Sequence, residues 1–193
     1  GHSLGGGLAT SFARLFDGVN TNVVDVNTFN SAGFNPVSLL LFAQIQSILG
    51  FSGDGYTNTR YVAENGLSAT ARDLLNIQYG SLNPLSQENS ANIVGNHFMY
   101  KITDLLALGN LLYTLDKSFT ISSLNKIVDA GSNKTEASYE SVLDAFRQMV
   151  GLYTSPTQIG DVDKSADSRV DYYKNIQELT DAINSGSLKK LVN

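Results

Sequence analysis

The chain opens with a serine between two glycines, Gly1-His2-Ser3-Leu4-Gly5, and this pattern constrains its fold more than any other feature. A serine in this setting is typical of a sharp turn from a β-strand into an α-helix, where glycines let the backbone pass itself closely. Apolar residues then recur at helical spacing up to Phe16, and Asp17-Gly18 is a stop signal. The opening residues therefore predict a strand end followed by a helix over 5–16.

Alternating strand and helix patterns follow this turn. Residues 22–30 carry β-branched and aromatic side chains between turn signals, as expected for a strand buried on both faces. A helix is predicted from Pro36 to about Leu49, and further strands are predicted over 58–63 and 82–85. This order indicates βαβ units and an α/β fold with a mostly parallel sheet.

The second half of the sequence is predicted to be almost entirely helical. Four amphipathic patterns occupy it, beginning near Phe98, Ser122, Ser138 and Val170. The change after His97 lacks a clean linker, which favours a lobe over a separate domain. We expect residues 1–116 to form part of an α/β core and residues 117–193 to form a helical lobe packed on it.

Composition excludes several classes of function. The net charge is −5 and the 13 Lys and Arg residues are scattered, so no basic stripe is present to bind nucleic acid. The absence of cysteine excludes disulfides, thiolate metal sites and cysteine nucleophiles, and it suits a secreted bacterial protein. Polar residues interrupt the longest apolar run, around 37–49, so it is too short to span a bilayer.

An acidic segment at 161–167 alternates oxygen-bearing side chains like part of a calcium loop. It lacks the glycine at the sixth position and the glutamate at the twelfth that such loops use. A solvated acidic loop is the favoured interpretation, and no metal is predicted.

The opening turn places Ser3 for nucleophilic chemistry. Such a turn exposes the serine Oγ, and the N-terminus of the following helix adds positive potential. The N–H of Leu4 would be one donor of an oxyanion hole for a tetrahedral intermediate. The alternative interpretation is a glycine-rich terminal stub without a role, which the amphipathic helix pattern after the motif disfavours.

A serine nucleophile needs a base, and the chain has two histidines. His2 neighbours Ser3 and is predicted to project to the opposite side of the strand. His97 lies in a polar loop before a helix, where the chain order of serine, acid and histidine places the base. His97 is therefore the predicted base, and a purely structural histidine is the alternative.

The acid that would orient the imidazole is predicted in the loop after the second strand. Glu64 is the first carboxylate there, followed by Asp73 and, further on, Glu88. Glutamate can replace aspartate in this role, so Glu64 is the first choice. The alternative is a solvated carboxylate without a role.

Four segments carry a resemblance to a known family: Gly-His-Ser-Leu-Gly-Gly-Gly-Leu-Ala at 1–9, Thr-Phe-Asn-Ser-Ala-Gly at 28–33, Arg-Tyr-Val-Ala-Glu-Asn-Gly-Leu at 60–67, and Asn-His-Phe-Met-Tyr-Lys-Ile-Thr-Asp-Leu-Leu-Ala-Leu at 96–108. In these segments, the first 115 residues or so resemble bacterial lipase-like α/β-hydrolases of the class 3 and haemagglutinin or calcium-binding-repeat lipase group. Related lipases often have Asp near position 65, where this sequence has Asn. The resemblance implies the C-terminal part of an α/β-hydrolase that cleaves acyl esters of glycerides or phospholipids.

In such a hydrolase the serine turn follows a central strand, and an earlier loop supplies the second oxyanion donor. These elements do not precede Gly1 in this sequence. We therefore expect an N-terminal segment of the same parent protein as a partner, beside a lipid or small ester substrate and transient contact with a lipid surface.

The leading functional hypothesis is a secreted bacterial serine ester hydrolase, lipase-like or phospholipase-like, with a Ser3-His97-Glu64 triad and no cofactor. A lipase-derived binding or scaffold fragment of a larger secreted protein, inactive by itself, is the main alternative. A thioesterase or peptidase with the same triad is a third, because the substrate pocket lies largely outside these residues.

Overall fold

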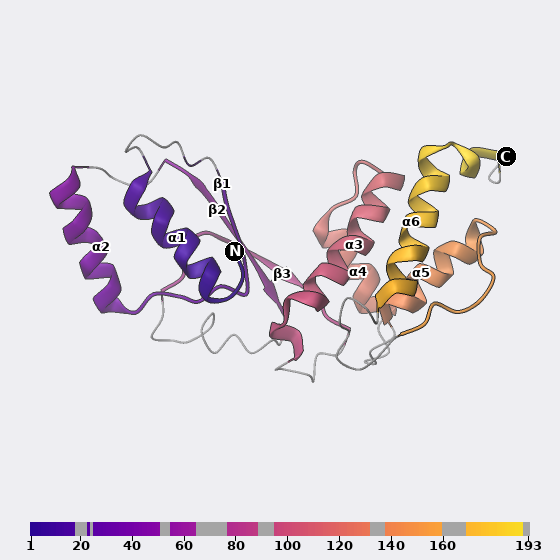
Figure 1. Cartoon of the computed structure of the whole chain (residues 1–193), viewed down its shortest axis with the longest axis horizontal. Coiled ribbons are helices and arrows are strands. Elements are labelled where there is room, and N and C mark those ends of the chain that lie inside the picture. The colour runs from indigo at the N-terminus through magenta and orange to yellow at the C-terminus, as the bar shows by residue number, and fades with distance from the viewer. Residues whose placement is uncertain are drawn as a thin grey trace. The chain divides into compact units, whose positions relative to one another are not determined.

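The protein forms two compact units (Figure 1). The computed structural model describes residues 1–17, 23, 25–50, 55–64, 77–88, 95–131, 138–159 and 169–190. Unit 1 comprises Gly1–Leu85 and Ile93–Met99, and unit 2 comprises Ser86–Asn92 and Tyr100–Asn193. Helix α3, Met99–Leu115, therefore lies almost entirely in unit 2. The division predicted at residue 116 placed these residues with the sheet.

Unit 1 contains a three-stranded parallel sheet in the order β1-β2-β3. Strand β1 spans Asp25–Phe29, β2 spans Thr57–Ala63 and β3 spans Ser81–Leu85. In the register, Asp25 of β1 lies opposite Thr57 of β2, and Thr59 of β2 lies opposite Ser81 of β3. The predicted α/β class with a parallel sheet is confirmed, and the strands expected over 58–63 and 82–85 are present.

Strand β1 is buried on one face only, so the prediction of burial on both faces is wrong. Val26 and Thr28 are buried, whereas Asp25 and Asn27 are exposed. Successive side chains of a strand point to opposite faces, and helix α1 packs on one face of β1. The apolar composition of the segment therefore reflects its single packed face.

The described residues of unit 1 also form two α-helices, and both match the predicted segments. Helix α1 spans Leu4–Phe16, and α2 spans Pro36–Leu49. The Asn35 side chain caps α2 by accepting a 2.8 Å hydrogen bond from Ser38 N, and Gly50 ends this helix with φ 77°. Helix α1 ends at Asp17, while Gly18 lies outside the described residues.

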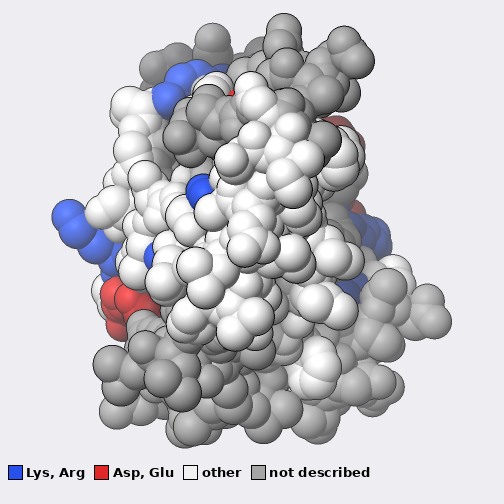
Figure 2. All heavy atoms as spheres, turned by 90° about the vertical axis from the view of Figure 1, so that its left-hand side faces the viewer, with Lys and Arg blue, Asp and Glu red and all other residues white. Residues whose placement is uncertain are grey.

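Both helices expose apolar side chains. These are Leu4, Leu8, Phe12 and Phe16 on α1 and Val37, Leu40, Leu41 and Ile48 on α2. Figure 2 views the side on which α2 lies and shows few charged side chains there. Among the helices in the described ranges, none is both long and apolar enough to cross a membrane.

Where the structure describes unit 2, it contains four α-helices. They are α3 at Met99–Leu115, α4 at Ile121–Gly131, α5 at Ser138–Met149 and α6 at Val170–Asn184. A 3-10 turn, η3, follows at Ser187–Lys190. The core is formed by fully buried side chains that include Ile102, Leu105, Leu108, Leu111, Leu124, Tyr139, Leu143 and Tyr172. The apolar face of α3 is therefore core.

A buried ionic network joins α3, α5 and α6. Arg169 Nε lies 2.9 Å from Asp104 Oδ2, and an Arg169 terminal nitrogen pairs with the Glu140 carboxylate. Tyr173 donates its hydroxyl to Asp104 Oδ1 at 2.8 Å. Burial alone lowers the pKa of Arg169, but attraction to the Asp104 and Glu140 carboxylates outweighs it and raises that pKa. The cation is thus held charged inside the unit.

Candidate active site

The opening residues lie beside β1 and turn directly into α1. His2 forms a parallel bridge with Phe29, Phe29 N donates to Gly1 O at 2.8 Å, and Ser3 N donates to Phe29 O at 3.0 Å. Ser3 then adopts φ 51° and ψ −125°, and Leu4 begins the helix. A positive φ is uncommon for a residue with a side chain and marks local strain. The structure therefore has the sharp turn into a helix that the sequence predicts, with Ser3 at its corner, but the residues before it form a single parallel bridge at His2 and no full strand.

The close approaches in this turn involve Gly1 and Gly6. A Cβ atom on Gly1 would lie 2.4 Å from Gly5 O, and one on Gly6 would lie 2.6 Å from the Cβ of Ser31. A Cβ on Gly5 would meet no heavy atom within 4 Å. The prediction that Gly5 is required for space is wrong, because the helix approaches the chain after β1 through Gly6.

Ser3 and His97 are brought together from positions 94 residues apart. Ser3 Oγ and His97 Nε2 are separated by 3.2 Å, within hydrogen-bonding distance. His97 is the last residue of the 3-10 turn η1, Gly95–His97, which belongs to unit 1 like Ser3. This is the arrangement expected of a serine nucleophile and its base.

Leu4 is the first residue of α1, so its N–H has no acceptor in a preceding helical turn. This N–H lies at the positive end of a 13-residue helix, directly after Ser3. The position suits a donor to a developing oxyanion, which is the role predicted for Leu4.

Glu64 lies at the end of the sheet where the His97 loop is attached. It directly follows β2, its N–H donates to Leu85 O at 2.8 Å, and its carbonyl accepts from Asn96 Nδ2 at 3.5 Å. These main-chain bonds fix residue 64 next to the neighbour of His97. Orientation of the imidazole by the Glu64 carboxylate stays a prediction.

The two alternative acids differ from Glu64 in their surroundings. Asp73 lies outside the described residues. Glu88 is fully buried in unit 2, and its Oε1 accepts a 3.0 Å hydrogen bond from Tyr139 N in the first turn of α5. The Glu88 carboxylate thus satisfies a main-chain donor at the start of a helix.

His2 does not project away from the site, so that prediction is wrong. Its Nε2 lies 2.8 Å from the main-chain oxygen of His97, and the two imidazole rings have centroids 5.2 Å apart. Alternation along a strand would separate the side chains of His2 and Ser3, but the positive φ of Ser3 takes it out of the strand. Both side chains therefore contact residue 97.

Asn30 is a site residue that sequence reasoning missed. It directly follows β1, is 1% exposed and has φ 44°. Its Nδ2 donates to Asn96 O and His97 O, each at 3.2 Å, and its Oδ1 accepts from Ala63 N at 2.9 Å. Asparagine after a strand signals a turn and tolerates positive φ, which is the one signal the sequence offers.

No group of three or more metal-ligating side chains is gathered in the described parts of the chain. The acidic segment at 161–167 lies outside those residues.

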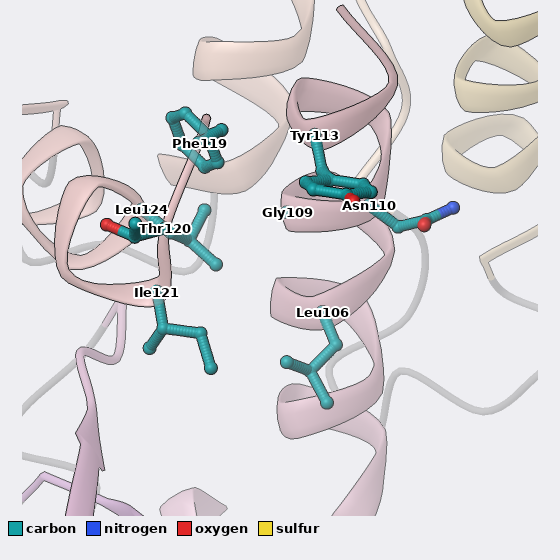
Figure 3. Close-up of a pocket in the computed structure, with 8 residues that line it drawn as sticks. All are labelled: Leu106, Gly109, Asn110, Tyr113, Phe119, Thr120, Ile121 and Leu124. Carbon is teal, nitrogen blue, oxygen red and sulfur yellow. The ribbon is translucent and has the colours of Figure 1, made fainter. Parts of the chain in front are cut away.

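Unit 2 contains an apolar pocket of about 240 Å³ between α3 and α4. Figure 3 shows Leu106 and Tyr113 of α3 on one side, and Phe119, Ile121 and Leu124 on the other. In the structure one face of α3 is core and the Leu106 face borders this pocket.

The chain was compared with profiles of known protein families, with curated proteins and with solved structures, and none of the three comparisons gave a match. The geometry around Ser3 and His97 is therefore the basis for assigning a function.

Proposed function

We propose that this protein is a serine ester hydrolase of the lipase or phospholipase type that cleaves acyl esters of lipids. The observation that carries the proposal is the 3.2 Å approach of His97 Nε2 to Ser3 Oγ at a strained turn into a helix. A serine held in this way beside an imidazole is the arrangement used for acyl transfer. The fold around it is proposed to be the C-terminal part of an α/β-hydrolase.

In the proposed reaction, Ser3 Oγ attacks the ester carbonyl carbon while His97 Nε2 takes the hydroxyl proton. The carbonyl oxygen becomes an oxyanion, which accepts a hydrogen bond from Leu4 N–H. The tetrahedral intermediate collapses, and the leaving alcohol takes the proton from the His97 imidazolium. Water activated by the same imidazole then attacks the acyl-enzyme, releasing the fatty acid and restoring Ser3. No cofactor takes part in these steps.

Glu64 is the proposed acid of the triad. Its main chain is tied to Leu85 and Asn96 at the end of the sheet where His97 lies. A carboxylate near the imidazole would favour the tautomer with Nδ1 protonated and stabilise the imidazolium that forms during attack.

An apolar acyl substrate is supported by the surroundings of the two reacting side chains. Leu4, adjacent to Ser3, is 68% exposed, and Phe98, adjacent to His97, is 49% exposed. Exposed apolar side chains of this size commonly mark binding surfaces. They suit transient contact with a lipid surface, and we propose a secreted bacterial enzyme as the setting.

The outer edge of β1 supports the proposed partner, an N-terminal segment of the parent protein. A groove of about 450 Å³ follows this edge, lined by Gly1, Phe12, Val26 and Asn27 among others. The first residues already pair with this edge in the parallel sense, because the amino group of Gly1 donates to Asn27 O at 2.8 Å and His2 forms a parallel bridge with Phe29. An added strand would satisfy the edge and cover the apolar groove.

The test uses the natural polypeptide that carries this sequence. We expect a fluorophosphonate probe to label Ser3, p-nitrophenyl esters to be hydrolysed, and both reactions to be lost in Ser3→Ala. Ser11→Ala is the matched control, because Ser11 lies on the same helix and its Oγ donates to Gly7 O at 2.8 Å. Unchanged ester hydrolysis in Ser3→Ala would refute the proposal.

The same experiment separates the other functions. A binding or scaffold protein, which the exposed apolar faces of α1 and α2 would suit, would bind its partner without labelling at Ser3. A thioesterase or peptidase would label but prefer thioester or peptide substrates over lipid esters.

A further inference from the structure

We infer that Asn30 and His2 form a clamp on the main-chain carbonyl of His97 and thereby position its imidazole against Ser3. Both are positioning residues that act through His97. The inference rests on the proposed serine hydrolase function, because the position of the His97 imidazole matters for catalysis only if His97 is the base.

Two donors converge on one oxygen atom. His2 Nε2 lies 2.8 Å from His97 O, and Asn30 Nδ2 lies 3.2 Å from the same oxygen. A carbonyl oxygen has two lone pairs, so these two bonds fill its capacity. Asn30 Nδ2 also donates to the preceding carbonyl, that of Asn96, at 3.2 Å. The main chain around the base is thus held by two side chains from elsewhere in the sequence.

Asn30 is itself held rigidly. Its N–H donates to Tyr61 O at 2.9 Å and its Oδ1 accepts from Ala63 N at 2.9 Å, so it is anchored to β2 through both main chain and side chain. Because Oδ1 faces an N–H, the amide orientation is fixed and Nδ2 must face the carbonyls of the His97 loop.

The clamp also distinguishes the two histidines chemically. A carbonyl oxygen can only accept, so Nε2 of His2 must carry a proton and donate it to His97 O. That nitrogen is then engaged as a donor and unsuited to act as a base. The corresponding nitrogen of His97 faces Ser3 Oγ and is the one that can accept its proton.

Ser3 and His97 are therefore both anchored to the end of β1. Ser3 is bonded to Phe29 through its N–H and follows His2 directly, while Asn30 is the residue after Phe29. The separation of Ser3 and His97 is therefore set through short connections by His2 and Asn30. Displacement of a reacting group by about 1 Å costs on the order of 100-fold in rate, so such a device has a large effect on catalysis.

The sharpest variant is Asn30→Asp. It preserves size and the acceptor that receives Ala63 N–H, but it replaces the donor with an oxygen facing two carbonyl oxygens. Asn175→Asp is the matched control, because Asn175 is also buried and donates through Nδ2, to Thr157 Oγ1 at 2.8 Å in unit 2. His2→Leu removes the second donor, and His2→Gln restores an N–H at nearly the same reach.

Asn30→Asp is expected to lower kcat for p-nitrophenyl ester hydrolysis by roughly 10-fold to 100-fold with KM unchanged. Where the new carboxyl is ionised, the acid limb of the pH-rate profile should move to higher pH, because a carboxylate beside residue 97 stabilises the imidazolium of His97. His2→Leu should lower kcat and the rate of fluorophosphonate labelling, and His2→Gln should recover most of that loss. Asn175→Asp should leave the rates and the pH profile unchanged.

A measurement independent of activity separates this inference from the proposed function. Histidine side-chain ¹⁵N NMR spectra should show His2 protonated at Nε2 near neutral pH, and this tautomer preference should weaken in Asn30→Asp and be kept in Asn175→Asp. Wild-type protein that is not labelled would overturn the proposed function, with the spectra still testing the clamp. If Asn30→Asp and His2→Leu both label at Ser3 and both keep the kcat and the pH profile of the wild type, the inference is overturned.

Discussion

Replacement of Gly6 by alanine should destabilise the protein and move Ser3, whereas the same change at Gly5 should not. A Cβ on Gly6 would lie 2.6 Å from the Cβ of Ser31 and 3.1 Å from Gly1 O. Carbon atoms in contact normally lie about 3.5–4.0 Å apart, so the start of α1 would have to shift by roughly 1 Å. Gly6 N donates to Ser3 O at 3.0 Å, and the shift would therefore be transmitted to Ser3.

The magnitude follows from two opposing terms. Overpacking of a tight contact costs about 1–3 kcal/mol, while exchanging glycine for alanine in a helix gains about 1 kcal/mol. Gly6→Ala should thus lower the free energy of unfolding by up to about 2 kcal/mol. Gly5→Ala meets nothing within 4 Å and should keep only the gain. Gly7→Ala should fall between them, because its Cβ would lie 3.2 Å from Ala32 O.

Urea unfolding of the three variants measures the stability order, and the rate of fluorophosphonate labelling measures the displacement of Ser3. A shift of about 1 Å should slow labelling in Gly6→Ala on the order of 100-fold and leave Gly5→Ala near the wild-type rate. Equal stability and equal labelling of Gly5→Ala and Gly6→Ala would show that α1 does not pack against Ser31 as described.

Two predictions concern the buried charges and tyrosines of unit 2. Arg169→Met should lower the free energy of unfolding by about 3–5 kcal/mol, measured by urea denaturation, because it removes a buried cation from beside the Asp104 and Glu140 carboxylates. Burial raises the pKa of Tyr172 well above 10.0, so the folded state keeps its proton while the unfolded chain ionises. The contribution of the protonated Tyr172 to the free energy of unfolding is therefore complete below pH 10, and above that pH it should fall by about 1.4 kcal/mol per pH unit. In urea denaturation at a series of alkaline pH values, Tyr172→Phe should remove this part of the slope.

Local patterns in the sequence predicted most of the elements of unit 1 because short-range chemistry determines them. Pro36 and the glycine at position 50 bound α2, and the β-branched run of β2 is bounded by turn residues. The approach of His97 to Ser3 was predictable because a serine on such a turn needs a base and His97 lies at the expected place in the chain order.

Prediction from the sequence failed where the structure departs from a local rule or depends on contacts between residues far apart in the chain. Strand alternation was extended through His2 and Ser3, although the backbone of Ser3 has already left the strand. The role of Asn30 depends on contacts with a loop 66 residues away, which a turn propensity does not reveal. The burial of Arg169 depends on its contacts with Asp104 and Glu140, which lie on other helices, and only the packing of the helices shows it.

Among the described residues, the non-glycine positions with positive φ are Ser3 and Asn30, and they flank the same strand end at Phe29. Each such conformation costs on the order of 1–3 kcal/mol, so the structure concentrates strain at one place. Glycine would relieve the backbone cost at position 30, but it would also remove the bonds from Asn30 to Ala63, Asn96 and His97. The side-chain bonds offset the strain at Asn30, and the strain at Ser3 is what turns its Oγ toward His97. Strain that is kept where Ser3 and His97 meet, and offset by the bonds that align them, is what the proposed hydrolase would require of a preorganised site.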